Sequence, residues 1–300
     1  MKATLHNLSD DLVLIGLAPP LRGYSHFIGV WLYHRHDVSY IVDVGPASTA
    51  EDLLQALREL EIEHLDYILL THIHLDHAGA IGEIAARFAN TPIVCHGAAI
   101  PHLVDPTRLW QGSLKVLGAT AAGYGPIRPV PADRLIDVEK FHAKTVEPIL
   151  TPGHAPHHVA YRTSHCLFAG EAGGVWLPEF DYLRPATPPK FFLDVALDSV
   201  DKLIGCRPSC ICYGHFGLAE NGHEMLRRHH RQLRLWEQII RKVMGAFAEE
   251  DPTGACLNDL LRKDPLLSGF HRLPADIKER ETFFLSNSIR GFLGYVAAGG

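Results

Sequence analysis

The stretch THIHLDHAGA, from Thr71 to Ala80, places three histidines and one aspartate within six positions. It follows the apolar run HLDYILL, which predicts a buried β-strand ending at Leu70. The helix-forming segment GAIGEIAARF and then the apolar run TPIVCH come next. The stretch therefore lies where a strand ends and the chain turns toward a helix. This strand–helix–strand succession is typical of an α/β layered fold.

The side chains of this stretch are those that bind transition metals. In an extended chain, residues two apart point the same way, so His72 and His74 can share one ion. Asp76 and His77 fall on the following turn and can face a second ion. The pattern H-x-H-x-D-H arises by chance in roughly one chain in two hundred of this composition, and lone histidines are usually core or surface groups. Four ligand-type residues at the end of one strand still favour metal binding.

One segment cannot complete two coordination spheres, so further ligands must come from elsewhere. His154 lies in LTPGHAPHH, Glu171 in LFAGEAGG and His215 in CYGHFG. Each follows a predicted strand and a glycine, which allows close backbone approach and unusual φ values. Open α/β sheets bind ligands at the carboxyl ends of their strands. These three residues are therefore candidate ligands.

The other predicted elements continue the alternation. A capping-box spacing of Ser48 and Glu51 predicts a helix over STAEDLLQALREL. Residues 101–133 are rich in proline and glycine, which predicts an irregular lid or binding loop with two short helical pieces. The further predicted elements are strands at His26–Tyr33 and Ser39–Gly45, joined by a polar turn, strands in TVEPILTPGH, HHVAYRT, HCLFAGE and SCICYGHFG, and a helix over Phe191–Ile204.

The composition changes after Gly222, where long helical patterns begin. We expect an α/β domain over residues 1–218 and a C-terminal helical region over residues 219–300 that packs near the active site. The first of its helices runs from His223 to Glu250, and its Leu- and Trp-bearing face can pack on the body or on a second copy, as in a homodimer. Its basic cluster, from His223 to Arg231, is read as a solvated face, with phosphate or partner binding as the lesser alternative. Two more helices are predicted near Ala255–Arg262 and over Ala275–Ala297.

Bulk properties exclude several classes of function. The formal net charge of −6 gives no basic field for nucleic acid or an anionic membrane. No run approaches the roughly 18 apolar residues of a membrane span, and the first residues lack a signal peptide's apolar core. The six cysteines form no C-x-x-C pair and mostly lie in apolar runs, which favours buried free thiols over a cysteine metal site. We therefore expect a cytoplasmic protein with a small-molecule substrate.

The order of these motifs resembles a known family. H-x-H-x-D-H, then T-P-G-H, then G-D and a final G-H form the ligand signature of the metallo-β-lactamase superfamily, and IVDVGP is similar to its strand that carries an aspartate and a glycine, here Asp43 and Gly45. The resemblance covers roughly residues 10–218. It implies an αββα sandwich with the metals at one edge, and hydrolase chemistry. Asp76 makes the sequence more similar to the glyoxalase-II-like and lactonase-like branches than to true β-lactamases.

The resemblance implies a role for each matched residue. His72, His74 and His154 would hold the first metal, and Asp76, His77 and His215 the second. Two divalent transition metal ions, zinc first and iron or manganese next, would activate a bridging hydroxide for attack on a small ester, thioester or lactone, with a phosphodiester less favoured. Asp76 would also orient this hydroxide. The supporting residues around the ligands would be Asp43 and His158.

The sequence departs from the family pattern at one ligand. The family usually has aspartate where Glu171 stands, and the extra methylene moves the carboxylate about 1.5 Å. Glu171 can bridge both metals, bind one of them or swing away. The simpler alternative is a surface glutamate that binds no metal, beside a distorted or single-metal site. The substitution bears on metal identity and catalytic strength more than on the fold.

Two other functions stay open for such a sequence. Some relatives use one iron to oxidise persulfides, and others use two irons with a flavin domain. The di-iron type has glutamate at the position of His74, and no flavin domain is recognisable here. Some signalling effectors also have this fold, with helices over the pocket and weak residual hydrolysis. The hydrolase interpretation is favoured, and it depends on motif matching.

Overall fold

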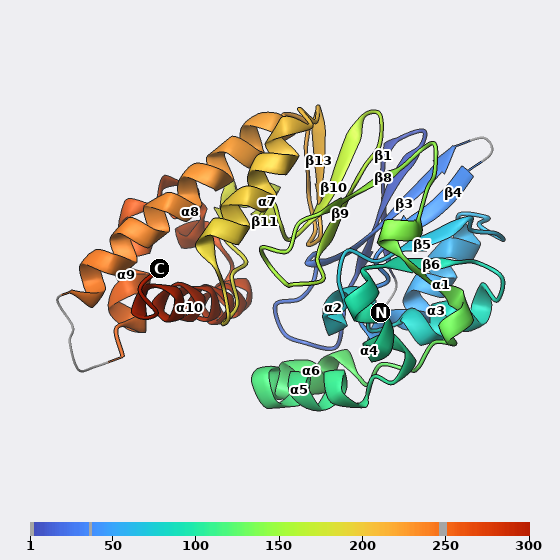
Figure 1. Ribbon diagram of the computed structural model, residues 1–300, viewed down its shortest axis with the longest axis horizontal. Helices are drawn as coiled ribbons and strands as arrows, with labels where there is room; N and C mark the ends of the chain where they lie inside the picture. The colour runs from blue at the N-terminus through green and yellow to red at the C-terminus, as the bar shows by residue number, and fades with distance from the viewer. Residues whose placement is uncertain (1–2, 36–37, 246–250) are drawn as a thin grey trace. The chain divides into compact units, whose positions relative to one another are not determined.

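Contacts within the chain divide it into two compact units (Figure 1). The computed structural model describes residues 3–35, 38–245 and 251–300. Unit 1 comprises Met1–Pro148 and Gly214–Phe216, and unit 2 comprises Ile149–Tyr213 and Gly217–Gly300. Each unit contains one large β-sheet with its own helices.

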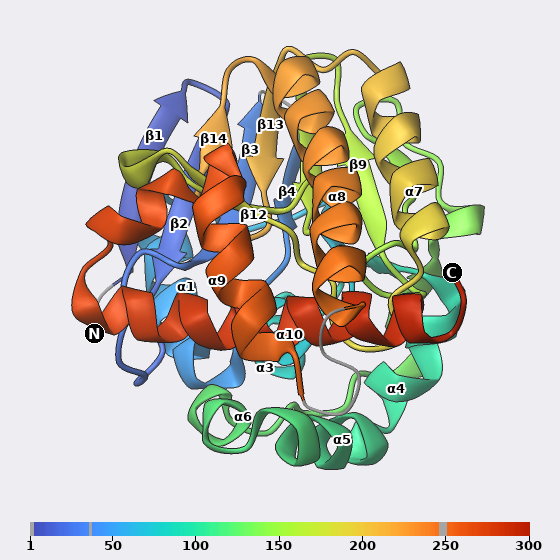
Figure 2. The same ribbon diagram turned by 90° about the vertical axis from the view of Figure 1, so that its left-hand side faces the viewer.

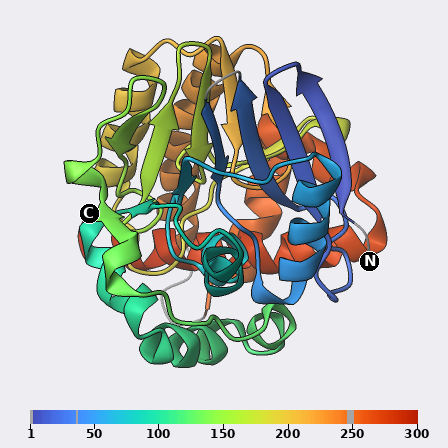
Figure 3. The same cartoon turned by 90° about the vertical axis from the view of Figure 1, so that its right-hand side faces the viewer.

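The sheet of unit 1 turns from antiparallel to parallel along its width (Figure 3). Its strands pair in chain order, antiparallel from β1 to β4 and parallel from β4 to β7. Parallel neighbours require crossover segments, and helices α1 (Ala50–Glu59) and α3 (Ile81–Arg87) lie in two of them. The carboxyl ends of β4 and β5 therefore meet at one edge. The strands are β1 (Thr4–Ser9), β2 (Leu12–Leu17), β3 (Ile28–Arg35), β4 (Val38–Val42), β5 (Tyr67–Leu69), β6 (Ile93–Cys95) and β7 (Leu135–Asp137).

The predicted strands of unit 1 are confirmed, but two local predictions are wrong. Residues 36 and 37 of the predicted turn between β3 and β4 lie outside the described residues. Helix α1 follows a 3₁₀ turn, and its N-cap Thr49 makes no side-chain capping bond, so the capping box at Ser48 does not form. Residues 101–133 are more helical than predicted, because Gly118 and Gly125 adopt positive φ and form the C-caps of two helices instead of opening a loop. These helices are α4 (Ile100–Val104), α5 (Thr107–Leu117) and α6 (Ala119–Tyr124).

Unit 2 is a mixed sheet with a small hairpin and the C-terminal helices. Its strand order is β14-β13-β10-β9-β8, and β10 and β13 are parallel. Figure 2 shows α7 and α8 side by side, with α10 running across the view near the lower end of α8. The strands are β8 (Glu147–Leu150), β9 (Val159–Arg162), β10 (Cys166–Gly170), β13 (Cys210–Tyr213) and β14 (Leu218–Ala219), with the hairpin β11 (Val175–Leu177) and β12 (Tyr182–Arg184). The helices are α7 (Leu193–Gly205), α8 (Gly222–Met244), α9 (Thr253–Lys263) and α10 (Ala275–Ala297).

The C-terminal helices belong to the packing of unit 2. Leu226, Leu233 and Trp236 of α8 are buried, and α8 contacts α7, α10 and β13. The compact units therefore do not follow the boundary expected at residue 218, and a separate helical domain over residues 219–300 stays a prediction. The apolar face of α8 packs within its own unit, so the homodimer stays a prediction without support from this face. Residues 246–250 of the predicted helix lie outside the described residues.

The expectation of six free thiols is wrong for two cysteines. Cys166 and Cys210 form a disulfide between paired positions of β10 and β13, with Cα atoms 4.8 Å apart. Pairing across parallel strands joins residues 44 apart in the chain, which no local pattern could indicate. The bond removes one ground for the cytoplasmic location, which stays a prediction. Among the described residues, every helix is too short or too polar to cross a membrane.

Candidate metal centre

The histidine-rich stretch begins where β5 ends in unit 1. His74 is the N-cap of α2 (Leu75–Ala78), so Asp76 and His77 lie in a single helical turn, as the spacing predicted. Nε2 of His72 and Nδ1 of His74 are 2.9 Å apart. Two imidazole nitrogens this close share a proton or a cation, and two ligand nitrogens on one zinc ion lie about 3.3 Å apart. The pair therefore fits one edge of a coordination sphere.

A second ligand group forms entirely within unit 1. Ligand atoms of Asp76, His77 and His215 lie within 4.8 Å of one another. His215 reaches this place because it forms a β-bridge with Ile28 of β3, and the main-chain oxygen of Phe27, just before β3, accepts a 3.0 Å hydrogen bond from the Phe216 amide. Its ring stacks on Phe27 with centroids 4.1 Å apart. Two imidazoles and a carboxylate are a donor set that suits zinc or iron.

Asp43 supports this group from the end of β4. The residue is buried and has a φ of 63°, and its Oδ2 lies 2.9 Å from Nδ1 of His77. The carboxylate holds the Nδ1–H tautomer, which leaves the Nε2 lone pair for a metal. Thr71 donates its amide to Asp43 Oδ1 at 2.8 Å, and its hydroxyl also lies 3.0 Å from Nδ1 of His72. Thr71 was missed from the sequence, although it directly precedes the first histidine.

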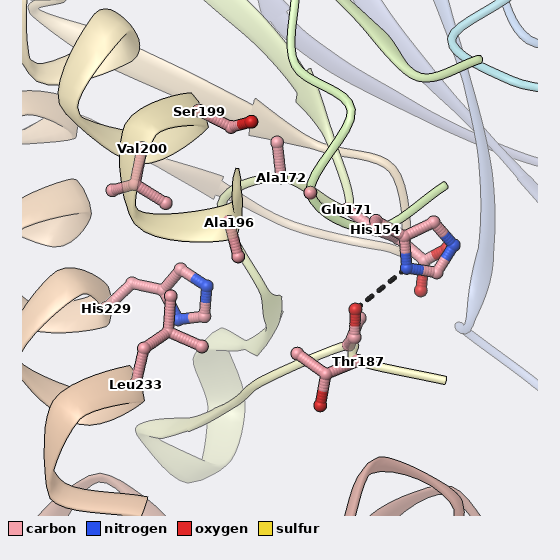
Figure 4. A pocket seen from close by; sticks show the side chains of 11 residues that line it. His154, Glu171, Ala172, Thr187, Ala196, Ser199, Val200, His229 and Leu233 are labelled. Atoms are coloured by element: carbon pink, nitrogen blue, oxygen red, sulfur yellow. Dashed lines mark hydrogen bonds and ion pairs between the residues drawn. The ribbon is translucent and has the colours of Figure 1, made fainter. Parts of the chain in front are cut away.

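Unit 2 brings together two of the predicted ligands. Nε2 of His154 and Oε2 of Glu171 are 2.9 Å apart, and both side chains are buried (Figure 4). Glycine is required before His154, because a Cβ on Gly153 would lie 2.6 Å from the Ala196 Cα. Nδ1 of His154 donates to the main-chain oxygen of Ala186 at 2.8 Å, so Nε2 is its ligand nitrogen. Glu171 therefore points at a metal-type imidazole despite its extra methylene.

His158 supports Glu171 from behind. The residue is fully buried, and its Nε2 accepts the main-chain N–H of Glu171 at 3.2 Å. Its Nδ1 lies 2.8 Å from the hydroxyl of Thr151. Both ring nitrogens are used by protein groups, so His158 cannot ligate a metal in this arrangement. Thr151 was also missed from the sequence, although it opens the T-P-G-H motif.

His229 shares a buried cavity with two of these ligands and is kept neutral. A narrow cavity of unit 2 extends from His154 and Glu171 to His229 (Figure 4). Burial lowers the pKa of His229 to about 4, so this imidazole is neutral at pH 7.

A third group of possible metal ligands consists of cysteines. The sulfur atoms of Cys166, Cys210 and Cys212 lie within 4.8 Å of one another, but the disulfide occupies two of them.

The sequence matches a family model described as "Metallo-beta-lactamase superfamily" over residues 26–215. Metallo-beta-lactamase fold-containing protein ST1585 of Sulfurisphaera tokodaii is 28% identical over 231 residues, which are 74% of this chain and 84% of that protein. The crystal structure of ST1585 is similar with a TM-score of 0.66 and 22% identity, over 88% of this chain and 100% of that one. These findings confirm the expected α/β fold class.

Two curated relatives have named activities, and each matches only part of this chain. Hydroxyacylglutathione hydrolase of Aeromonas hydrophila is 30% identical over 148 residues, which are 47% of this chain and 45% of that protein. Anaerobic nitric oxide reductase flavorubredoxin of Pectobacterium carotovorum is 37% identical over 67 residues, which are 22% and 13% of the two chains. The shared part is therefore compatible with more than one reaction.

Proposed function

This chain belongs to the metallo-β-lactamase superfamily, and from that membership we propose that it is a metal-dependent hydrolase acting on a small ester, thioester or lactone. The observation that carries the proposal is the group Asp76, His77 and His215, with an imidazole already oriented by a buried carboxylate. The partial similarity to a hydroxyacylglutathione hydrolase supports the ester or thioester class. The net charge of −6 favours a small molecule over nucleic acid. A cytoplasmic location and a homodimer complete the proposal.

We assign two divalent transition metal ions to the ligands that the sequence indicated. His72 and His74, together with His154, would hold one ion, and Asp76, His77 and His215 would hold the other. Glu171 would add its carboxylate beside His154, and its length allows it to reach one ion or both. When bound, such ions lower the pKa of water toward neutrality and polarise an acyl oxygen. Zinc suits these nitrogen and oxygen donors, and iron or manganese are the alternatives.

The protein's own groups would orient the reactants. The carboxylate of Asp76 would accept a hydrogen bond from the attacking water and hold its lone pair toward the acyl carbon. Asp43 and the Ala186 carbonyl keep His77 and His154 in the tautomer that presents Nε2. His158 holds the main chain of Glu171 by a hydrogen bond, so the Glu171 side chain extends from a fixed main-chain position. Catalysis would then need little rearrangement of the ligands.

Metal analysis combined with a hydrolysis screen tests this function. We expect two zinc equivalents per chain and turnover of at least one thioester, lactone or ester. The variant His72→Ala should lose one zinc equivalent and turnover together, whereas His102→Ala, at an exposed histidine of α4, should keep both ions and turnover. Turnover that persists after metal removal would contradict the proposal. A coloured iron protein that consumes oxygen would support the redox alternative instead.

A further inference from the structure

The main-chain oxygen that orients His154 lies in a segment held by the last helix of the chain. We call residues 184–188, which begin at the last residue of β12, the strap. Ala186, at the centre of the strap, accepts the hydrogen bond from Nδ1 of His154. Figure 4 draws this bond as a dashed line beside Thr187. We propose that helix α10 positions the metal ligand His154 by holding the strap. This inference rests on the proposed function, because it treats His154 as a ligand.

Ser288 of α10 contacts the strap on both sides of Ala186. Its hydroxyl donates to the main-chain oxygen of Pro185 at 3.1 Å and accepts the Thr187 amide at 3.3 Å. Its main-chain oxygen accepts the hydroxyl of Thr187 at 3.3 Å. These groups are buried, so water does not compete for their hydrogen bonds. The residue between them, Ala186, therefore has little freedom to move.

Gly291, one turn further along α10, lets the helix approach the strap directly. A Cβ at this position would lie 2.0 Å from the main-chain oxygen of Thr187 and 3.0 Å from that of Pro188. A distance of 2.0 Å is far inside van der Waals contact, and both obstructing atoms are main chain. Any side chain at residue 291 must therefore displace the strap or the helix.

An ion pair holds the beginning of the strap. Arg184 Nε and Glu281 Oε2 are 2.5 Å apart, and the exposed fractions of the two side chains are only 2% and 0%. Arg184 also donates to the Pro185 oxygen at 3.2 Å. Three points of α10, at residues 281, 288 and 291, therefore set the position of one carbonyl.

A main-chain carbonyl orients a metal-binding imidazole only through the position of its oxygen atom. It fixes the Nδ1–H tautomer and the ring orientation, which aims Nε2. Removal of such partners typically weakens metal binding about 10–100-fold. Because a mutation cannot delete the Ala186 carbonyl, the test must move the strap from behind. Gly291 and Gly294 offer a matched pair for this purpose, since both lie in α10 and a Cβ on Gly294 meets no atom within 4 Å.

The experiment compares Gly291→Ala with Gly294→Ala in the full chain by zinc titration against a competing chelator. We expect Gly291→Ala to weaken one of the two zinc ions about 10–100-fold and to leave the other unchanged. Gly294→Ala should bind both as the wild type does. Alanine favours helix at both positions, so a loss in Gly291→Ala alone reports the displaced strap. Equal zinc affinities in both variants would overturn the inference.

Two further measurements separate a folding defect from a failure of the proposed function. Ser288→Ala removes the strap bonds without a steric clash, and it should weaken the same zinc ion by a smaller factor. NMR of the His154 ring in the metal-free protein should show a hydrogen-bonded Nδ1–H in the wild type and a weakened Nδ1–H bond in both strap variants. If the wild type binds no zinc but the two variants show this weakening, the metal site is refuted and the positioning is retained. An unchanged Nδ1–H bond in both variants would refute the positioning.

Discussion

The two units orient their ligand imidazoles with different acceptors. In unit 1, the buried carboxylate of Asp43 accepts from His77 at 2.9 Å, whereas in unit 2 the neutral carbonyl of Ala186 accepts from His154 at 2.8 Å. A carboxylate raises the basicity of its imidazole more than a carbonyl does. It is also a single side chain that one mutation removes, while the carbonyl depends on everything that packs behind the strap. The support is therefore local in unit 1 and distributed over α10 in unit 2.

The largest effect should come from removing one ligand histidine in each unit. We expect His77→Ala and His154→Ala each to lower turnover at least about 100-fold, since loss of a supporting partner alone can cost that much. Each variant should also lose one of two zinc equivalents, because the ligand groups hold different ions. Zinc content by mass spectrometry measures this. Loss of both equivalents in either variant would contradict two separable sites.

The ion pair behind the strap should give the next largest effect. Glu281→Gln leaves Arg184 and Arg280 as uncompensated buried cations, which costs about 3–5 kcal/mol of unfolding free energy. Denaturant unfolding measures this loss. Glu224→Gln is the matched control, because its pair with Arg231 is more than half exposed and is screened by water, so its loss should change stability little. Equal effects in the two variants would show that the buried pair does not hold α10.

The same pair should have a characteristic pH dependence. Burial raises the pKa of Glu281, but the charges and hydrogen bonds of Arg184 and Arg280 outweigh it, so the pKa lies below its usual value. Its stabilisation is therefore fully present above the unfolded pKa of about 4.3 and is lost as pH falls toward the folded pKa. The stability difference between wild type and Glu281→Gln should shrink in acid. A difference that is constant from pH 7 to pH 3 would contradict this.

The carboxylate in unit 1 should give a smaller effect, confined to the other ion. Asp43→Asn keeps a residue that tolerates the φ of 63° and removes the negative charge beside His77. We expect the zinc held by His77 to weaken about 10–100-fold, and the zinc held by His154 to keep its affinity. Competition with a chelator measures both constants. A loss shared by the two ions would mean that the supports are coupled.

The smallest effect should come from the hydrogen bond behind His158. Thr151→Val removes the oxygen that faces Nδ1 of this buried imidazole, which costs about 1 kcal/mol of unfolding free energy. Thermal or denaturant unfolding measures the loss. Thr145→Val, at an exposed threonine before β8, is a control for the substitution itself. Equal stability of Thr151→Val and wild type would mean that this bond does not hold the ring that supports Glu171.

Some of this protein could be predicted because its signals are local. The spacing of His72, His74, Asp76 and His77 follows from a strand that ends and a helical turn that begins. The predicted helix over Ala275–Ala297 matches α10 at both ends. The capping box at Ser48 and the irregular segment 101–133 were wrong, because a 3₁₀ turn and positive-φ glycines redirected the local preferences.

The sequence by itself determined which side chains can bind metal and at which strand ends they stand, because residue type and spacing specify donors and local geometry. Only the tertiary structure decided what orients those donors. The acceptor for His154 is a main-chain oxygen, and every residue carries one, so no residue type marks Ala186. The disulfide of Cys166 and Cys210 and the seating of Gly291 on the strap likewise depend on segments about 40 and 100 residues apart, which only the packed fold brings into contact.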